Sequence, residues 1–226
     1  MAPDLGVLYA SARERISAML AGADDSVAAR AVPATPGWTV HDVVAHLRGI
    51  VDDALTGNMD GVATDPWTAA QVERGRTAPL PQLLAEWNRD APMIESFLSS
   101  PGGADNAAAV IDVHTHEADL RGALGLPPVV PDDYGPLMFS MLAGGLVERA
   151  NQAGLQAVRV CTTEGDEAGP ADAPVTVRLA RHELHRAALG RRSAEQIAAY
   201  FAGCTDPTVY VEPFVVFGPR ADALVD

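Results

Sequence analysis

One segment of the chain, from Asp112 to Asp119, concentrates two histidines and three carboxylates within eight residues of a sequence that has six histidines. No glycine or proline interrupts residues 104–121, and the alanine-rich start of this run favours a helix. In a helix, Asp112 and His116 stand at positions i and i+4 on one face, and Asp119 follows one turn later. A carboxylate oxygen and an imidazole nitrogen at this spacing can bind the same divalent ion. The segment therefore predicts part of a metal site, which needs a third ligand from elsewhere.

His46 is the best candidate for the third ligand. The sequence predicts a helix over residues 40–55 with Thr39 as its N-cap, and His46 lies on the apolar side of that helix, near Val43 and Leu47. Helical bundles build metal sites from inward-facing side chains on neighbouring helices. A single histidine on an apolar face also suits a core position with a hydrogen bond to a neighbour, and the pattern alone leaves that alternative open.

His114 is the competing ligand on the later segment. It shares a stripe with Glu117 and Arg121, and we expect this more polar stripe to face solvent. Apolar residues flank the stripe of Asp112 and His116 instead, which favours His116 as the ligand. The other histidines have weaker claims: His41, His182 and His185.

These side chains need a helical framework, and the hydrophobic periodicity predicts one. Helices are expected over residues 4–20, 40–55, 68–75, 82–98 (with a kink or a split at Pro92) and 134–151. The helix that contains Asp112 is expected to end near Gly125. The segment 57–77 is rich in Ala and Gly, and we interpret it as a mobile rim that could set specificity. After Gly154 the pattern changes to two strands, at 156–161 and 175–179, and two helices, at 182–189 and 193–201. The sequence thus predicts a mainly α protein with a smaller α+β part: an up-down helical bundle over residues 1–153 and a small α+β domain over residues 154–226.

The charge of the chain argues against two classes of partner. Acidic residues number 30 against 16 basic residues, which gives a formal charge of −14. Such a surface repels phosphate backbones and anionic lipids, so we expect neither nucleic acid nor a membrane as partner. No apolar run approaches the roughly 20 residues that span a bilayer, and the N-terminus lacks the pattern of a secretory signal.

The two cysteines indicate a reduced, cytoplasmic location. Cys161 and Cys204 show neither CxxC spacing nor a disulfide framework. We interpret both as small buried hydrophobic residues rather than as catalytic thiols.

Four segments together resemble the mycothiol-dependent maleylpyruvate isomerase family, whose bundle is DinB-like. The stretch Trp38–Leu47 is similar to the family's tryptophan-containing entry into its second helix, and Asp112–Gly125 is similar to its acid-x-x-x-His-x-x-Asp-Leu segment. The stretches Glu183–Gln196 and Phe217–Arg220 resemble the C-terminal domain of actinobacterial members. The four segments are spread along most of the chain, from Trp38 to Arg220, in the family's order.

The resemblance implies a metal site. In the family a divalent metal, usually zinc, is held by a histidine of the second helix together with an acid and a histidine of a later helix. The matching positions here are His46, Asp112 and His116. The isomerase itself has a glutamate at the position of Asp112, so the shorter acid is expected to hold the metal closer to its helix or more weakly.

The resemblance also implies the chemistry. Family members are expected to use mycothiol, a low-molecular-weight thiol that binds the metal as a thiolate and adds to an electrophile. Addition, rotation and elimination give cis–trans isomerisation, whereas addition alone gives S-transfer. An anionic keto-acid substrate would need a cation, and Arg220 is our candidate for this catalytic role, with Arg48 as a second candidate.

Two alternatives stay open from the sequence. One is a zinc-dependent hydrolase on the same scaffold, and the other is a DinB-like binding or stress-response module without catalysis. We expect a monomer or a homodimer whose partners are a small-molecule substrate and a thiol.

Overall fold

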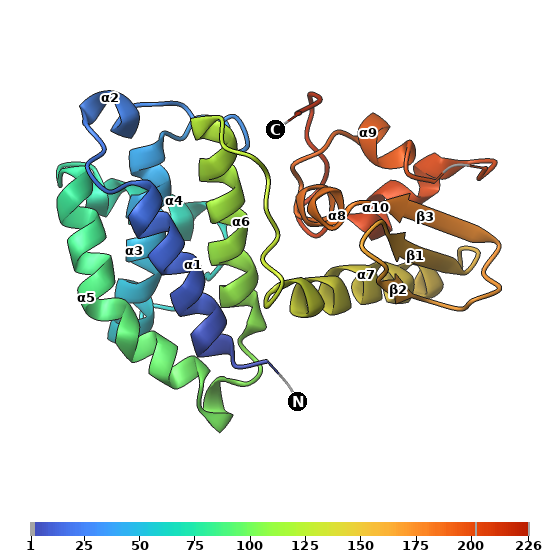
Figure 1. The fold of residues 1–226 in the computed structure, drawn as a ribbon, viewed down its shortest axis with the longest axis horizontal. Coiled ribbons are helices and arrows are strands. Elements are labelled where there is room, and N and C mark those ends of the chain that lie inside the picture. Colours follow the sequence, from blue (N-terminus) through green and yellow to red (C-terminus); the bar gives the residue numbers. More distant parts are fainter. Residues whose placement is uncertain (1–2, 202, 226) are drawn as a thin grey trace. The chain divides into compact units, whose positions relative to one another are not determined.

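The computed structural model describes residues 3–201 and 203–225, which form ten α-helices and one three-stranded sheet (Figure 1). They divide into two compact units, one ending at Pro127 and the other beginning at Pro128. The predicted fold class, a helical bundle with a smaller α+β part, is confirmed. Among the described residues, no helix combines the length and the apolar character that crossing a bilayer requires.

Four long helices form a bundle in the first unit: α1 (Leu5–Met19), α3 (Val40–Thr56), α5 (Leu80–Leu98) and α6 (Ala107–Leu124). Helices α1 and α3 each pack against both α5 and α6, so the four helices share one core. Three shorter elements complete the unit: α2 (Asp25–Ala28), α4 (Asp65–Gly75) and the 3₁₀ helix η1 (Pro101–Gly103). The core consists of apolar side chains from all four long helices, among them Leu8, Ile16, Val43, Leu47, Leu83, Trp87, Val113 and Leu120.

Local signals fix where the site-bearing helices begin and end. Thr39 and Asp42 form a capping box, in which each side chain accepts a hydrogen bond from the other residue's backbone N–H, so α3 begins where the sequence predicts. Helix α6 ends at Leu124, and its C-cap is Gly125, whose φ of 69° suits glycine. Helix α5 continues through Pro92 as one helix, so the chain does not split at this exposed residue.

The second unit combines five helices with a small mixed sheet. Its helices are α7 (Gly135–Gln152), α8 (Arg181–Ala188), α9 (Ala194–Ala198), the 3₁₀ helix η2 (Pro207–Tyr210) and α10 (Val211–Phe214). Its strands are β1 (Val158–Thr162), β2 (Glu167–Ala168) and β3 (Val175–Leu179). The strand order is β2-β1-β3, with β1 antiparallel to β2 and parallel to β3. Within the described residues, the sequence pattern missed five elements, which are all short: α2, η1, β2, η2 and α10.

The boundary between the compact units differs from the prediction. The sequence pattern assigns residues 134–151 to the bundle and places the boundary between residues 153 and 154, whereas the structure divides the chain after Pro127. Helix α7 packs against α8, α10 and β1, and it buries Met138, Leu142 and Leu146. Its apolar face therefore completes the core of the second unit, which the helical period alone cannot distinguish from a bundle helix.

Candidate metal centre

The three predicted metal ligands come together in the first unit. His46 lies on α3, and Asp112 and His116 lie on α6; one potential donor atom from each lies within 4.8 Å of the other two. The Asp112 carboxylate stands between the imidazoles, with Oδ2 3.8 Å from Nε2 of His46 and Oδ1 3.6 Å from Nε2 of His116. Within the described residues, this is the one cluster of His, Cys, Asp or Glu side chains that could hold a metal ion.

The geometry and chemistry of these donors fit a divalent ion of the zinc type. Two ligand atoms that each lie about 2.0–2.2 Å from a tetrahedral ion are roughly 3.3–3.6 Å apart. The nitrogen–oxygen separations of 3.8 and 3.6 Å are close to that range. The side chains of His46 and His116 are only 6% and 7% exposed, whereas that of Asp112 is 37% exposed. The cluster is thus enclosed on its imidazole side and accessible on its carboxylate side.

Each of the two histidines uses Nδ1 for a hydrogen bond to a buried polar side chain. Nδ1 of His116 lies 3.1 Å from Oδ2 of Asp119, and Nδ1 of His46 lies 2.7 Å from Oε1 of Gln71. Carboxylate and amide oxygens accept hydrogen bonds, so Nδ1 is the nitrogen that carries the proton in the neutral form of each ring. Nε2 then keeps its lone pair on the side of Asp112, which is the arrangement that metal-binding histidines adopt.

Trp38, just before the N-cap of α3, packs on both imidazoles. Its ring centroid lies 5.2 Å from that of His46 and 6.0 Å from that of His116, and the second pair is nearly parallel at 22°. The two imidazoles lie 4.9 Å apart in an edge-to-face arrangement. The half-buried indole therefore covers both rings and limits their rotation.

His114 does not face solvent, which corrects the prediction made from its polar stripe. Its side chain is 1% exposed and lies against α1, where Nε2 is 3.3 Å from the carbonyl oxygen of Leu8 and Nδ1 is 3.4 Å from Nη2 of Arg15. His114 and Glu117 of this stripe can be buried because Arg15 forms a two-point ion pair with Glu117, at 2.8 and 2.7 Å. Burial and the charge of Arg15 lower the pKa of His114 from 6.5 to about 3. Both ring nitrogens already have protein partners, which disfavours His114 as a ligand.

The two arginines considered for an anionic substrate have different surroundings. Arg48 pairs with Glu86 of α5, with 3.0 Å between Nε and Oε2. Arg220 lies in the second unit, where its backbone N–H donates to the carbonyl oxygen of Arg192 at 3.0 Å and its Nε lies 3.4 Å from the carbonyl oxygen of Asp222. The role of Arg220 towards a substrate stays a prediction.

Sequence reasoning missed two residues behind His46. Gln71 on α4 and Asp53 on α3 are 1% and 2% exposed, and Nε2 of Gln71 donates to Oδ2 of Asp53 at 2.7 Å. Asn58 and Arg74 donate to the other carboxylate oxygen, at 2.8 and 2.6 Å. Burial raises the pKa of Asp53, but these three hydrogen bonds outweigh it and hold the pKa below its usual range. A signal was available, because Asp53 follows His46 by two helical turns and therefore lies on the same face of α3.

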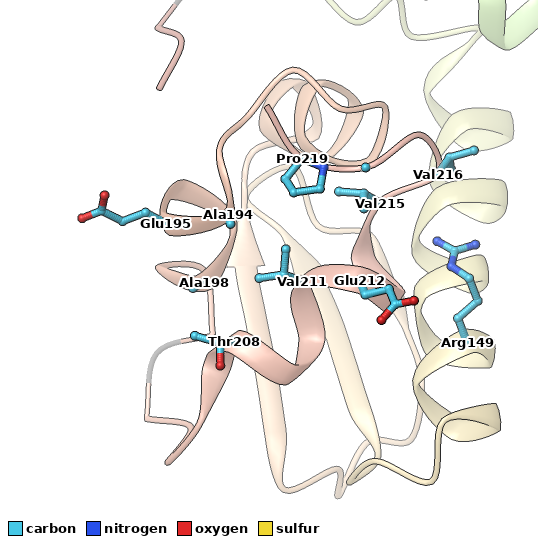
Figure 2. Close-up of a pocket in the computed structure, with 11 residues that line it drawn as sticks. Arg149, Ala194, Glu195, Ala198, Thr208, Val211, Glu212, Val215, Val216 and Pro219 are labelled. Atoms are coloured by element: carbon cyan, nitrogen blue, oxygen red, sulfur yellow. The ribbon is translucent and has the colours of Figure 1, made fainter. Parts of the chain in front are cut away.

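A separate pocket lies in the second unit (Figure 2). It has a volume of about 950 Å³ and is lined mainly by small apolar side chains of α9, α10 and the segment after α10, with Arg149 of α7 also contributing. None of the residues predicted to form a site lines it, although Pro219 next to Arg220 does.

The fold and the donors define a class of protein: a helical bundle that presents histidine, aspartate and histidine from two helices, followed by a small α+β unit. The family model of the mycothiol maleylpyruvate isomerase N-terminal domain matches residues 9–123 of the 226. The chain therefore belongs to this family, which is named for an enzyme. The matched region lies within the first unit and contains all three candidate ligands.

Solved structures support the same fold over most of the chain. A crystal structure of mycothiol-dependent maleylpyruvate isomerase is 15% identical, covers 83% of this chain and 88% of its own, and has a TM-score of 0.52. A variant of the mycothiol-dependent maleylpyruvate isomerase, with one histidine replaced by alanine, gives 14% identity, the same coverage and a TM-score of 0.50. Comparison with curated proteins gives no significant sequence match.

Proposed function

We propose that this chain is a metal-dependent enzyme that uses the thiol mycothiol. It would either isomerise a small electrophilic substrate or transfer the thiol to it. Membership of the mycothiol maleylpyruvate isomerase family supports the thiol and the reaction class. The observation that carries the metal dependence is the convergence of two imidazole Nε2 atoms on one carboxylate, at 3.8 and 3.6 Å.

His46, Asp112 and His116 would hold the metal, and we propose zinc because imidazole and carboxylate donors at this spacing suit that ion. When bound, the metal would supply a positive charge that stabilises a thiolate at neutral pH. Three protein ligands leave a coordination position for such an exogenous group. The exposed carboxylate side of the cluster is the side on which that group could approach.

The neighbouring residues hold the ligands in place. Asp119, which is 1% exposed, accepts the Nδ1 proton of His116 and increases the electron density on Nε2. Trp38 packs on both imidazoles and keeps water away from that side of the cluster. The ligands are thereby ordered before any metal binds, which lowers the entropic cost of binding it.

The first test is elemental analysis of protein purified without chelator, followed by activity screening. We expect about one zinc per chain, and turnover of conjugated electrophiles that requires both the metal and added thiol. Turnover with metal but without thiol would instead identify a hydrolase that uses metal-activated water. A folded protein that takes up no metal would overturn the proposal in favour of a binding module.

Arg220 is proposed to bind the negative charge of an anionic substrate. A charge-assisted hydrogen bond contributes about 1.5–3 kcal/mol, so Arg220→Ala should raise the KM for a carboxylate substrate by roughly tenfold or more. A neutral ester of the same substrate and the zinc content should be unaffected, and Arg220→Lys should restore part of the affinity. Equal effects on the acid and the ester would contradict this role.

A further inference from the structure

The buried amide of Gln71 stands between a candidate metal ligand and a fixed carboxylate. Its Oε1 lies 2.7 Å from Nδ1 of His46, and its Nε2 lies 2.7 Å from Oδ2 of Asp53. All three residues are buried, with at most 4% of each residue's surface exposed. Water is therefore largely excluded as a substitute for either hydrogen bond, and the contacts must be satisfied within the protein.

Asp53 determines which way the Gln71 amide points. A carboxylate can only accept, so the amide NH₂ group must face Asp53 and the amide oxygen must face His46. The amide oxygen carries no proton, so Nδ1 of His46 must donate. Asp53 is itself held by Asn58 and Arg74, which donate to its Oδ1 at 2.8 and 2.6 Å. Arg74 and Gln71 thus both donate to Asp53, and His46 donates to Gln71, so the donor and the acceptor of each hydrogen bond are fixed.

The backbone of α3 leaves room for this amide. A Cβ atom on Gly49 would lie 2.6 Å from Cβ of Gln71, closer than real atoms approach. A Cβ atom on Gly75 would lie 2.5 Å from Cβ of Ala45, so both helices use glycine where α3 and α4 touch. Gly49 follows His46 by three residues, which places it on the same face of α3. Glycine at both contacts allows α4 to bring Gln71 within reach of the imidazole.

We infer that Gln71 is a positioning residue for the metal centre: it holds His46 in the Nδ1–H tautomer with Nε2 directed at Asp112. This inference rests on the proposed metal site and adds α4 to it. Helix α4 then supports the metal centre in two ways: Gln71 contacts His46, and Arg74 holds Asp53. Loss of such a supporting hydrogen bond typically weakens metal binding by about 10- to 100-fold.

The test compares Gln71→Leu with the wild-type protein in two measurements. In the metal-free protein, long-range ¹H–¹⁵N NMR should show His46 as the Nδ1–H tautomer in the wild type and as a mixture in Gln71→Leu. In competition with a chromophoric chelator, Gln71→Leu should bind zinc about 10- to 100-fold more weakly. Gln82→Leu is the matched control, because Gln82 is an exposed glutamine whose amide donates to Glu86 on the same helix. This variant should match the wild type in both measurements.

Gly49→Ala provides a second variant that removes no polar group. Its new methyl group should displace Gln71 and weaken zinc binding, as Gln71→Leu does. If Gln71→Leu fails to fold, Gly49→Ala still tests the role of Gln71. Wild-type zinc affinity and an unchanged His46 tautomer in both variants would overturn the inference. A wild-type protein that binds no zinc would overturn the proposed function, and the tautomer in the metal-free protein would still support or overturn the role of Gln71.

Discussion

Two histidines on α6, only two residues apart, have opposite surroundings. His116 faces α3, and its Nδ1 is bonded to Asp119 while its Nε2 lies 3.6 Å from the partly exposed Asp112. His114 faces α1, where one ring nitrogen lies 3.3 Å from the Leu8 carbonyl oxygen and the other lies 3.4 Å from Arg15. Both imidazoles are buried, so burial alone does not distinguish a ligand from a structural residue.

The difference lies in how many ring nitrogens the protein uses. On the His114 face, both ring nitrogens have hydrogen-bond partners, and the pKa of about 3 keeps His114 neutral. On the His116 face, Nδ1 is hydrogen-bonded to Asp119, and Nε2 is directed at Asp112, the second candidate metal ligand of α6. A polar cluster that satisfies itself stabilises the fold, whereas one that leaves lone pairs converging can bind a cation. The predictions below test this division of α6 into a structural face and a ligand face.

The largest effect is expected from His116→Ala, which removes one of three proposed ligands. Supporting residues typically change metal affinity by about 10- to 100-fold, so loss of a ligand itself should exceed about 100-fold. Elemental analysis after gel filtration should find about one zinc per wild-type chain and almost none in the variant, with a similar circular dichroism spectrum.

His114→Gln is the matched control on the other face. A glutamine amide can donate to the Leu8 carbonyl oxygen and accept from Arg15, so the fold should persist and zinc content should equal that of the wild type. If His114→Gln loses zinc while His116→Ala keeps it, the assignment of the two faces is reversed.

The next effect is a loss of stability in acid that comes from His114. Its pKa is about 3 in the folded chain against 6.5 in the unfolded chain. Above pH 6.5 both states are neutral and His114 contributes no pH dependence. Below pH 6.5 only the unfolded state takes up the proton, so the free energy of unfolding should fall by up to about 1.4 kcal/mol per pH unit towards pH 3.

Urea unfolding between pH 7 and pH 4 measures this slope. Carboxylates with lowered pKa values, such as Asp53 and Glu183, also lose stabilisation in acid, so the contribution of His114 is the difference between the wild type and His114→Gln. The variant should show a shallower decline from pH 6.5 downward. Parallel curves would mean that His114 becomes protonated without unfolding the chain.

Much of the ligand face could be predicted from the sequence, because its signals are local. The i and i+4 spacing of Asp112 and His116 fixes a shared helix face, and Thr39 fixes the start of α3 and so the direction of His46. The environment of His114 could not be predicted in this way. His114 and Glu117 are buried because Arg15, about a hundred residues earlier, neutralises Glu117, and no local pattern reports that pairing.

The support of His46 was missed for a related reason. The sequence predicts a short helix over residues 68–75, which α4 (Asp65–Gly75) confirms, but the pattern does not show that this helix carries Gln71 to His46. The close contact of Gly49 with Gln71 is a tertiary feature that a helical period does not reveal. Helix α7 shows the same limit, because its apolar stripe predicts burial but not the unit against which it is buried.

A smaller effect is expected from Asp119→Ala, which removes the hydrogen-bond acceptor of His116. Zinc affinity should fall by about 10- to 100-fold, and Asp119→Asn should lose less because its amide oxygen can still accept the Nδ1 proton. Competition with a chromophoric chelator measures both. Glu117→Gln on the structural face should lower the free energy of unfolding through its ion pair with Arg15 and leave zinc affinity unchanged. Weaker zinc binding in Glu117→Gln would show that the two faces are coupled.

The smallest effect is expected from Trp38, which contacts both proposed histidine ligands without a hydrogen bond to either ring. Contacts between aromatic rings contribute about 0.5–1.5 kcal/mol, so Trp38→Leu should weaken zinc binding by roughly two- to tenfold in the same competition assay. Trp38→Phe keeps a ring against His46 and His116 and should remain near the wild type. The order Asp119→Ala, then Trp38→Leu, then Trp38→Phe follows if hydrogen bonds at Nδ1 orient the ligands and the indole only covers them. A loss in Trp38→Leu as large as that in Asp119→Ala would show that ring packing, rather than the partner of Nδ1, separates the ligand face of α6 from its structural face.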